Sequence, residues 1–207
     1  MNMRWFLSVI VVLLAGCAEK GPVLIGNVKY LVPENSAAAA QKVVVAVSPF
    51  KDDRGKIASV LGKMTVRNDV ENDLVVQGAV ADMVTTAFKE ALKSRGVSVR
   101  AAPAWDMKAE TIAGDGFDIL IGGEIKTLWV EVDSQVLTVK EQAEVQLRVS
   151  AADRSARTII KTLNMKSKVE KQEMTFHVDA VEELLSEALT SAIDQLLKDE
   201  EFKKKIH

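Results

Sequence analysis

The sequence predicts an α+β fold in which helices pack on one face of a mixed, mainly antiparallel sheet. Two stretches carry apolar residues at helical spacing, and three long stretches alternate apolar and polar residues as strands do. The elements follow the order β-α-β-β-β-β-α, which favours helices that cover the apolar face of the sheet. With 207 residues, of which 48% are hydrophobic, the chain can bury the core of one domain.

The first 16 residues have the features of an export signal. Arg4 is followed by an apolar run, Phe6 to Leu14, that is too short for a spanning helix of roughly 20 residues. The next residues complete the motif Leu14-Ala15-Gly16-Cys17, which resembles the bacterial lipobox. The resemblance implies a diacylglycerol on the Cys17 sulfur, cleavage before Cys17 and acylation of the new amino group. An ordinary signal peptide with an incidental cysteine is the alternative.

The N-terminal organisation has three parts. Residues 1–16 are the predicted signal, residues 17–41 a lipidated tether, and residues 42–207 a single α+β domain. The tether is rich in proline, glycine and alanine, although its apolar stretch at 23–32 can dock as a short edge strand. Ala18 follows the cysteine, and within the lipobox resemblance a residue other than Asp there implies the outer membrane, facing the periplasm.

A strand and a loop are expected at the start of the domain. Residues 42–50 hold a continuous β-branched run that ends at Pro49, which is typical of a buried strand. Residues 51–73 are polar and contain glycine, so they predict a long loop.

A helix and a short strand come next. Asn72 or Asp73 can cap the helix, and Gly96 lies just past its end. Its apolar stripe comprises Val76, Val80, Met83, Ala87 and Ala91. Residues 97–101 then form a strand, and a strand–helix–strand unit predicts parallel pairing through a right-handed crossover.

Three longer strands follow a connector at 103–116 that holds at most one helical turn. In the strand at 117–132 the apolar parity shifts near Gly122 and Gly123 or just after them, which predicts a bulge. The strands at 139–149 and 159–169 alternate cleanly, as in antiparallel strands with one wet face.

The chain is expected to end in a helix. Apolar residues recur at helical spacing over 179–197, and residues 199–206 add a short, loosely held turn.

The composition excludes several functions. A formal net charge of −2 without a long basic stretch disfavours nucleic-acid binding. Cys17 is the only cysteine and His177 and His207 are the only histidines, so neither a zinc site nor a hydrolytic triad is expected. The acids from Asp69 onward fail the calcium-loop pattern, because Leu74 stands where glycine is needed. We therefore expect no enzyme, no catalytic residue, no metal and no cofactor.

Three residues are candidates for binding a partner. Arg54 follows the first strand in an Asp-Asp-Arg-Gly segment and could pair with a carboxylate or phosphate, although a tight turn explains the same residues. Trp105 lies in the connector, where an indole can cap the core or line a partner groove. Trp129 is out of phase with its apolar neighbours and could lie on the wet face, either packed at an edge or available to a partner.

The combined pattern resembles the YajG family of bacterial lipoproteins. It rests on the lipobox, the valine-rich first strand, the Asp-Arg loop, the helix ending Lys93-Ser94-Arg95-Gly96, and the last helix through Phe202. A wider similarity is to envelope lipoproteins that act by binding proteins. The lipid anchor, the short tether and the missing catalytic set favour an outer-membrane-anchored, non-enzymatic accessory protein whose partners are the membrane and an envelope protein. The sequence does not determine the oligomeric state. The alternative is a carrier or sensor of a small amphiphile, such as a lipid or glycan fragment.

Overall fold

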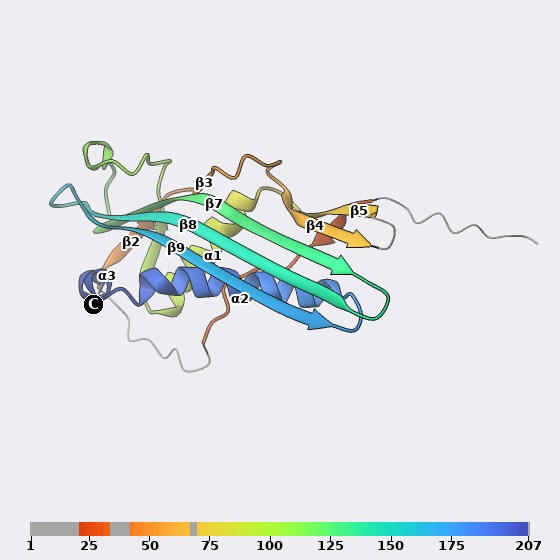
Figure 1. The fold of residues 1–207 in the computed structure, drawn as a ribbon. Helices are drawn as coiled ribbons and strands as arrows, with labels where there is room; N and C mark the ends of the chain where they lie inside the picture. Colours follow the sequence, from red (N-terminus) through yellow and green to blue (C-terminus); the bar gives the residue numbers. More distant parts are fainter. Residues whose placement is uncertain (1–20, 34–41, 67–69, 207) are drawn as a thin grey trace, which may run out of the picture.

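The computed structural model describes residues 21–33, 42–66 and 70–206, and shows a mixed sheet with helices on one face (Figure 1). The expected α+β class is confirmed. Cys17 and the predicted signal lie outside the described residues. The strands are β1 (Val23–Ile25), β2 (Val44–Val47), β3 (Lys51–Asp52), β4 (Val60–Val66), β5 (Val70–Val76), β6 (Ser98–Ala101), β7 (Ile119–Ser134), β8 (Val139–Asp153) and β9 (Thr158–Glu173). The helices are α1 (Val80–Ser94), α2 (Val178–Leu197) and α3 (Glu200–Ile206), with a short 3-10 turn at Ala109–Thr111.

Strand β7 is the centre of the sheet. One of its edges pairs antiparallel with β8, which pairs antiparallel with β9. The other edge pairs in parallel with β2, β3 and β4 in succession along its length. Two strand groups, β2–β6 and β4–β5–β1, therefore lie end to end beside the same long strand.

The expected loop at 51–73 is wrong, because most of this stretch forms strands β3, β4 and β5. Asn72 and Asp73 lie within β5 and do not cap α1, which begins at Val80 after Ala79. The polar residues misled the prediction because only the end of β5 faces the core, at the buried Leu74 and Val76. The element order therefore contains strands before α1 that the sequence pattern did not reveal.

Other expectations are confirmed. Strands β2 and β6 pair in parallel, and the predicted bulge lies between Ile125 and Thr127 of β7. Helix α1 ends where expected, before Gly96, whose φ of 75° is costly for other residues. The prediction of a loosely held turn at the C-terminus is wrong, because α3 buries Phe202 and Ile206 in the main core.

Side chains fill both faces of the sheet near β2. The main core lies between the sheet and helices α1 and α2. A second, smaller apolar cluster lies on the opposite face, where the connector folds over β2 and β7, and comprises Ala46, Ile112, Phe117, Leu120 and Ala152. Successive residues of β7, such as Ile119 and Leu120, point into different clusters, because side chains along a strand alternate between the two faces of the sheet.

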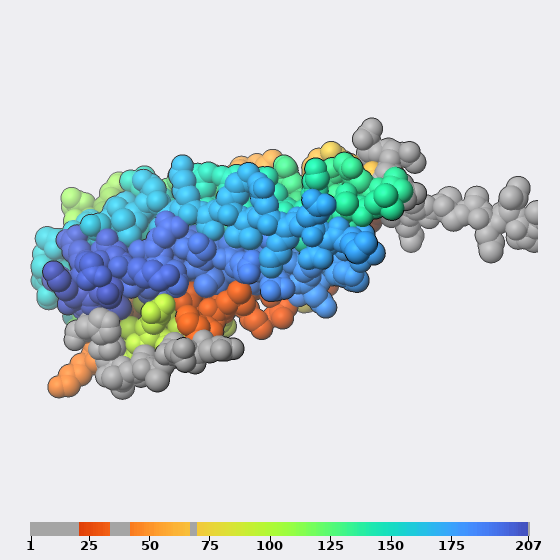
Figure 2. Space-filling model, turned by 60° about the horizontal axis from the view of Figure 1, so that its bottom comes forward, coloured from red at the N-terminus to blue at the C-terminus, as the bar shows by residue number. Residues whose placement is uncertain are grey.

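Residues 21–33 dock on the domain and run along α2 (Figure 2). Strand β1 pairs in parallel with β5, and the following backbone amides bond to α2 side chains at successive turns. Asn27 N donates to Glu182 Oε1 (3.0 Å), Lys29 N to Ser186 Oγ (3.1 Å) and Leu31 N to Thr190 Oγ1 (2.8 Å). The described part of the expected tether is thus held by the body.

Candidate interaction surface

Trp129 lies on the face of β7 that points away from α2. Its neighbours Leu128 and Val130 are buried in the main core, so the indole must project to the other side, where it is half-buried beside Glu144 of β8. Lys56 Nζ lies 4.8 Å from the indole ring centroid, within the range of a cation–π contact. A hollow of about 190 Å³ beside the ring is lined by Arg54, Lys56, Lys126, Thr127, Leu128, Trp129 and Glu144.

Arg54 forms the support for this hollow. Its Nε and Nη2 donate to the two carboxylate oxygens of Asp52 at 2.8 and 2.7 Å, and its Nη1 donates to the carbonyl oxygens of Val60 (2.7 Å) and Leu128 (3.2 Å). Only 2% of the side chain is exposed. The guanidinium therefore pairs with a carboxylate of this chain rather than with that of a partner.

The Asp52–Gly55 segment also has the geometry of a tight turn. Arg54 N donates to Asp52 Oδ1 at 3.2 Å, and Gly55 has a φ of 65°. Bonding to Arg54 lowers the pKa of Asp52, which keeps the pair charged. Arg54 thus ties the loop after β3 to β7, and this loop carries Lys56 to the Trp129 ring.

Trp105 packs differently from Trp129. Its ring lies over Gly122 of β7, where an added Cβ would approach the indole to 2.8 Å, and its Nε1 donates to Lys108 O at 3.0 Å. Its backbone N donates to the buried Ser48 Oγ at 2.9 Å. Trp105 therefore caps the second apolar cluster, and the structure does not bring it into the Arg54–Trp129 site.

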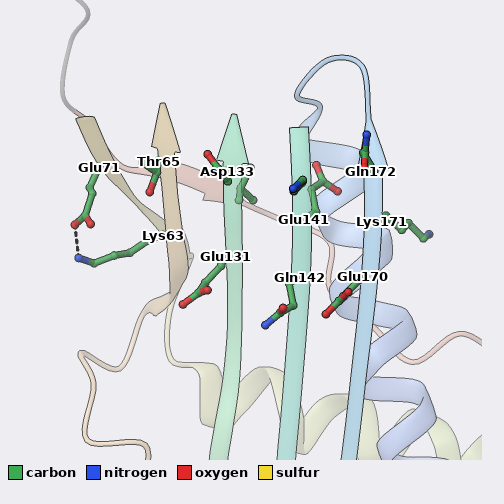
Figure 3. A pocket seen from close by; sticks show the side chains of 12 residues that line it. Lys63, Thr65, Glu71, Glu131, Asp133, Glu141, Gln142, Glu170, Lys171 and Gln172 are labelled. Atoms are coloured by element: carbon green, nitrogen blue, oxygen red, sulfur yellow. Dashed lines mark hydrogen bonds and ion pairs between the residues drawn. The ribbon is translucent and has the colours of Figure 1, made fainter. Parts of the chain in front are cut away.

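A polar groove of about 680 Å³ runs across the open ends of β4, β7, β8 and β9 (Figure 3). Its lining mixes the acidic residues Glu71, Glu131, Asp133, Glu141 and Glu170 with the basic residues Lys63, Lys140 and Lys171. Lys63 pairs with Glu71 across β4 and β5, which raises the pKa of Lys63. With Trp129 preceding Glu131 on β7, the groove and the Trp129 hollow adjoin along one strand.

Glu141 is the polar residue that sequence reasoning missed. Its position on β8 shares the inward parity of Val139 and Ala143, and only 1% of the residue is exposed. Both carboxylate oxygens lack a hydrogen-bond partner among the described residues. Burial raises the pKa of Glu141, and the neighbouring Glu173 adds to this effect. The sequence does contain a signal for this burial, because Glu141 is an acid at an inward position of a strand whose other inward positions are apolar.

The described residues hold neither a metal-binding cluster nor a membrane-spanning helix. No group of three His, Cys, Asp or Glu side chains is placed to hold a metal ion in the part of the chain that the structure covers. Among the helices of residues 21–33, 42–66 and 70–206, none combines the length and hydropathy needed to cross a bilayer.

Comparison with known proteins identifies a family. A family model described as uncharacterized lipoprotein matches residues 31–207. No curated protein sequence matches the chain.

Solved structures share the fold. Protein XCC0632 from Xanthomonas campestris is 15% identical, with 84% of this chain and 92% of that chain covered and a TM-score of 0.53. A neuraminyllactose-binding hemagglutinin homologue from Helicobacter pylori is 11% identical, with 86% and 95% covered and a TM-score of 0.50. At these identities the likeness extends to the fold alone.

Proposed function

The chain belongs to the family of uncharacterized lipoproteins whose model spans residues 31–207, and on that premise we propose that it is a non-enzymatic binding protein anchored to the outer membrane. In this proposal Cys17 carries the lipid and the folded body faces the periplasm. The match to the lipobox at residues 14–17 supports the anchor, since two or more acyl chains bind stably to a bilayer. The narrower resemblance to the YajG family stays a prediction.

The body binds an envelope protein through the face of its sheet that lies opposite α1 and α2. The observation that carries this proposal is Trp129, a half-buried aromatic on an open face with Lys56 over its ring. Tryptophan is enriched among the residues that dominate binding energy in protein interfaces. The adjoining groove supplies charged and amide groups for a polar rim.

Arg54 and Trp105 act indirectly in this proposal. Arg54 positions the loop that carries Lys56, because its donors all bond within the chain. Trp105 stabilises the connector on the second cluster. Trp129 is then the partner contact of the three expected from the sequence.

The test is site-specific photo-crosslinking in the native host. A benzophenone amino acid replaces Lys126, which lines the hollow beside Trp129, in one strain and the exposed Lys204 of α3 in a control strain. We expect an adduct with one envelope protein from position 126 and none from position 204. The variant Trp129→Ala, without the crosslinker, should bind that same protein with at least about tenfold lower affinity than the parent, which corresponds to a loss of about 1.4 kcal/mol of binding free energy. Equal adducts from both positions would contradict the proposal.

Mass spectrometry tests the anchor separately. The mature protein purified from membranes should begin at Cys17 and carry both thioether-linked and amide-linked acyl chains. An unacylated Cys17 thiol in the soluble periplasmic fraction would overturn the anchor.

The amphiphile carrier is the weaker function. It needs an apolar cavity between the sheet and the helices, and there the described side chains pack at 0–9% exposure. A hollow of about 470 Å³ between β1 and α1 has some apolar lining, including Leu24, Val28 and Met83, but it is an open surface groove.

A further inference from the structure

Three strongly exposed apolar side chains lie in two neighbouring turns at one end of the molecule. Val136 and Leu137 are 67% and 79% exposed in the turn between β7 and β8, and Met174 is 85% exposed in the turn between β9 and α2. Figure 1 shows both turns at the same end, on the right of the view. Exposed apolar side chains that gather at one site indicate a contact surface.

The hairpin presents two of these side chains as a tip. Gln135 N donates to Thr138 O at 2.9 Å, which closes the turn and leaves Val136 and Leu137 beyond the last bonded pair. Gln135 Nε2 donates to Asp133 Oδ2, so the polar residues turn back toward the sheet. Val139 pairs with Glu173, which places Met174 directly beside the hairpin.

The described chain begins at this same end. Val23 is opposite Leu74, Leu74 is opposite Gly62, and Gly62 is opposite Val130 of β7. Because β1 runs in the opposite direction to β7, the chain before Val23 heads toward the end of β7 at Ser134. Pairing of β1 with β5 and the bonds to α2 hold this exit in place.

The distance to the lipid is short. Cys17 precedes Gly21 by only four residues, and a chain spans at most about 3.6 Å per residue, so Cys17 lies within about 14 Å of Gly21. If Cys17 is acylated, its thioether lies at the membrane surface. The end that carries Val136, Leu137 and Met174 then faces the bilayer at close range.

We propose that Val136, Leu137 and Met174 insert into the interfacial region of the bilayer as a second membrane contact beside the Cys17 lipid. This inference rests on the proposed anchor. Asp133 and Lys140 flank the hairpin tip with opposite charges, so the contact is apolar and does not require anionic lipid. The lipid and the tip together would fix the body upright, with β7 and its neighbours leading away from the membrane.

The experiment uses the mature lipidated protein with a single fluorescent probe. Acylation blocks the sulfur of the only natural cysteine, so an introduced cysteine is the one free thiol. Leu137→Cys and Met174→Cys report the tip, and Ile57→Cys is the matched control, because Ile57 is 71% exposed in the loop between β3 and β4. Each is labelled with an environment-sensitive nitrobenzoxadiazole group and reconstituted in dioleoylphosphatidylcholine vesicles with or without nitroxide-labelled lipid.

We expect probes at 137 and 174 to shift to shorter wavelength and to lose emission to the nitroxide lipid, while the probe at 57 does neither. A protein that floats with the vesicles but shows three water-exposed probes would overturn this inference and leave the anchor standing. Probes that are shielded from water but insensitive to nitroxide lipid would indicate a second copy at the tip, and would also overturn it. Protein that fails to float and labels at Cys17 would overturn the anchor, and this inference with it.

Discussion

Tyr30 Oη donates a hydrogen bond of 2.7 Å to Asp194 Oδ1. The bond joins the N-terminal segment to the last full turn of α2, and only 2% of Tyr30 is exposed. Together with Glu182, Ser186 and Thr190, Asp194 completes a stripe of side chains one turn apart that receives residues 26–31. Burial raises the pKa of Tyr30, so the phenol stays a donor at neutral pH.

Removing the Tyr30 hydroxyl should loosen this segment. Tyr30→Phe is expected to lower the free energy of unfolding by about 1 kcal/mol, since the buried bond to Asp194 is lost. Urea denaturation measures the change, and amide hydrogen exchange should speed up at Lys29 and Leu31. The control Lys198→Met removes the 70% exposed partner of the same carboxylate and should cost less than about 0.5 kcal/mol. Equal losses in the two variants would contradict this account.

The Arg54–Asp52 pair is expected to stabilise the loop after β3. Arg54→Ala should lower the free energy of unfolding by about 3 kcal/mol, because it leaves Asp52 and two backbone carbonyls without their donor. Adding Asp52→Ala should cost little more, because both changes remove the same interaction. Lys168→Ala is the matched control: its pair with Glu170 is exposed and is worth at most about 1 kcal/mol.

Asp153 predicts an acid-sensitive contact between the β8–β9 turn and α3. Bonds from Ala156 N, Ser155 Oγ and Lys205 Nζ lower its pKa from 3.8 to about 2. The pKa of Asp153 is lower in the folded protein than in the unfolded chain. Its contribution to the free energy of unfolding is therefore complete above pH 3.8 and is lost as the pH falls toward 2.

Asp153→Asn should therefore reduce stability at pH 7 by about 1 kcal/mol and remove part of the decline between pH 4 and pH 2. Urea midpoints measured across this range, beside the exposed control Asp115→Asn, check the result. An undiminished acid decline in Asp153→Asn would show that other carboxylates produce it.

The burial of Glu141 predicts the opposite pH dependence of the folding stability. Because burial raises its folded pKa above 4.5, ionisation of Glu141 opposes folding as the pH rises past this value. Lys171 and His177 lower the pKa, and Glu173 raises it, so the burial effect prevails.

The variant Glu141→Gln should be more stable than the parent at pH 7, by about 1 kcal/mol, and no more stable below pH 4. Thermal unfolding at the two pH values measures this. Glu131→Gln, on the exposed face of β7, should show no such pH-dependent gain. A loss of stability at pH 7 in Glu141→Gln would mean that the carboxylate has a role that the described contacts do not reveal.

Local pattern was enough for the elements whose buried face is regular. The alternation over 139–149 and 159–169 predicted β8 and β9, and the parity shift after Gly123 predicted the bulge before Thr127. It failed at β5, where Glu71 and Asp73 face solvent and only Leu74 and Val76 reach the core. A strand that buries so little has no periodic signal, and its pairing with β1 and β4 is what stabilises it.

The candidate site followed the same division. The phase of Trp129 against Leu128 and Val130, which is a local property of a strand, indicates that the indole could lie on the open face, and it does lie there. The burial of Arg54 could not be predicted from the sequence, because its backbone acceptors at Val60 and Leu128 belong to two other strands, β4 and β7.

The sequence by itself determined the α+β class, the long hairpin, the helix faces and the lipobox, because each depends on residues within a few positions of one another. Only the tertiary structure decided that residues 26–31 run along α2, that Arg54 bonds within the chain and that Val136, Leu137 and Met174 gather at the end where the chain enters the domain. These depend on residues up to 164 positions apart, as Tyr30 and Asp194 are, and the packing that brings such residues together leaves no periodic trace in the chain.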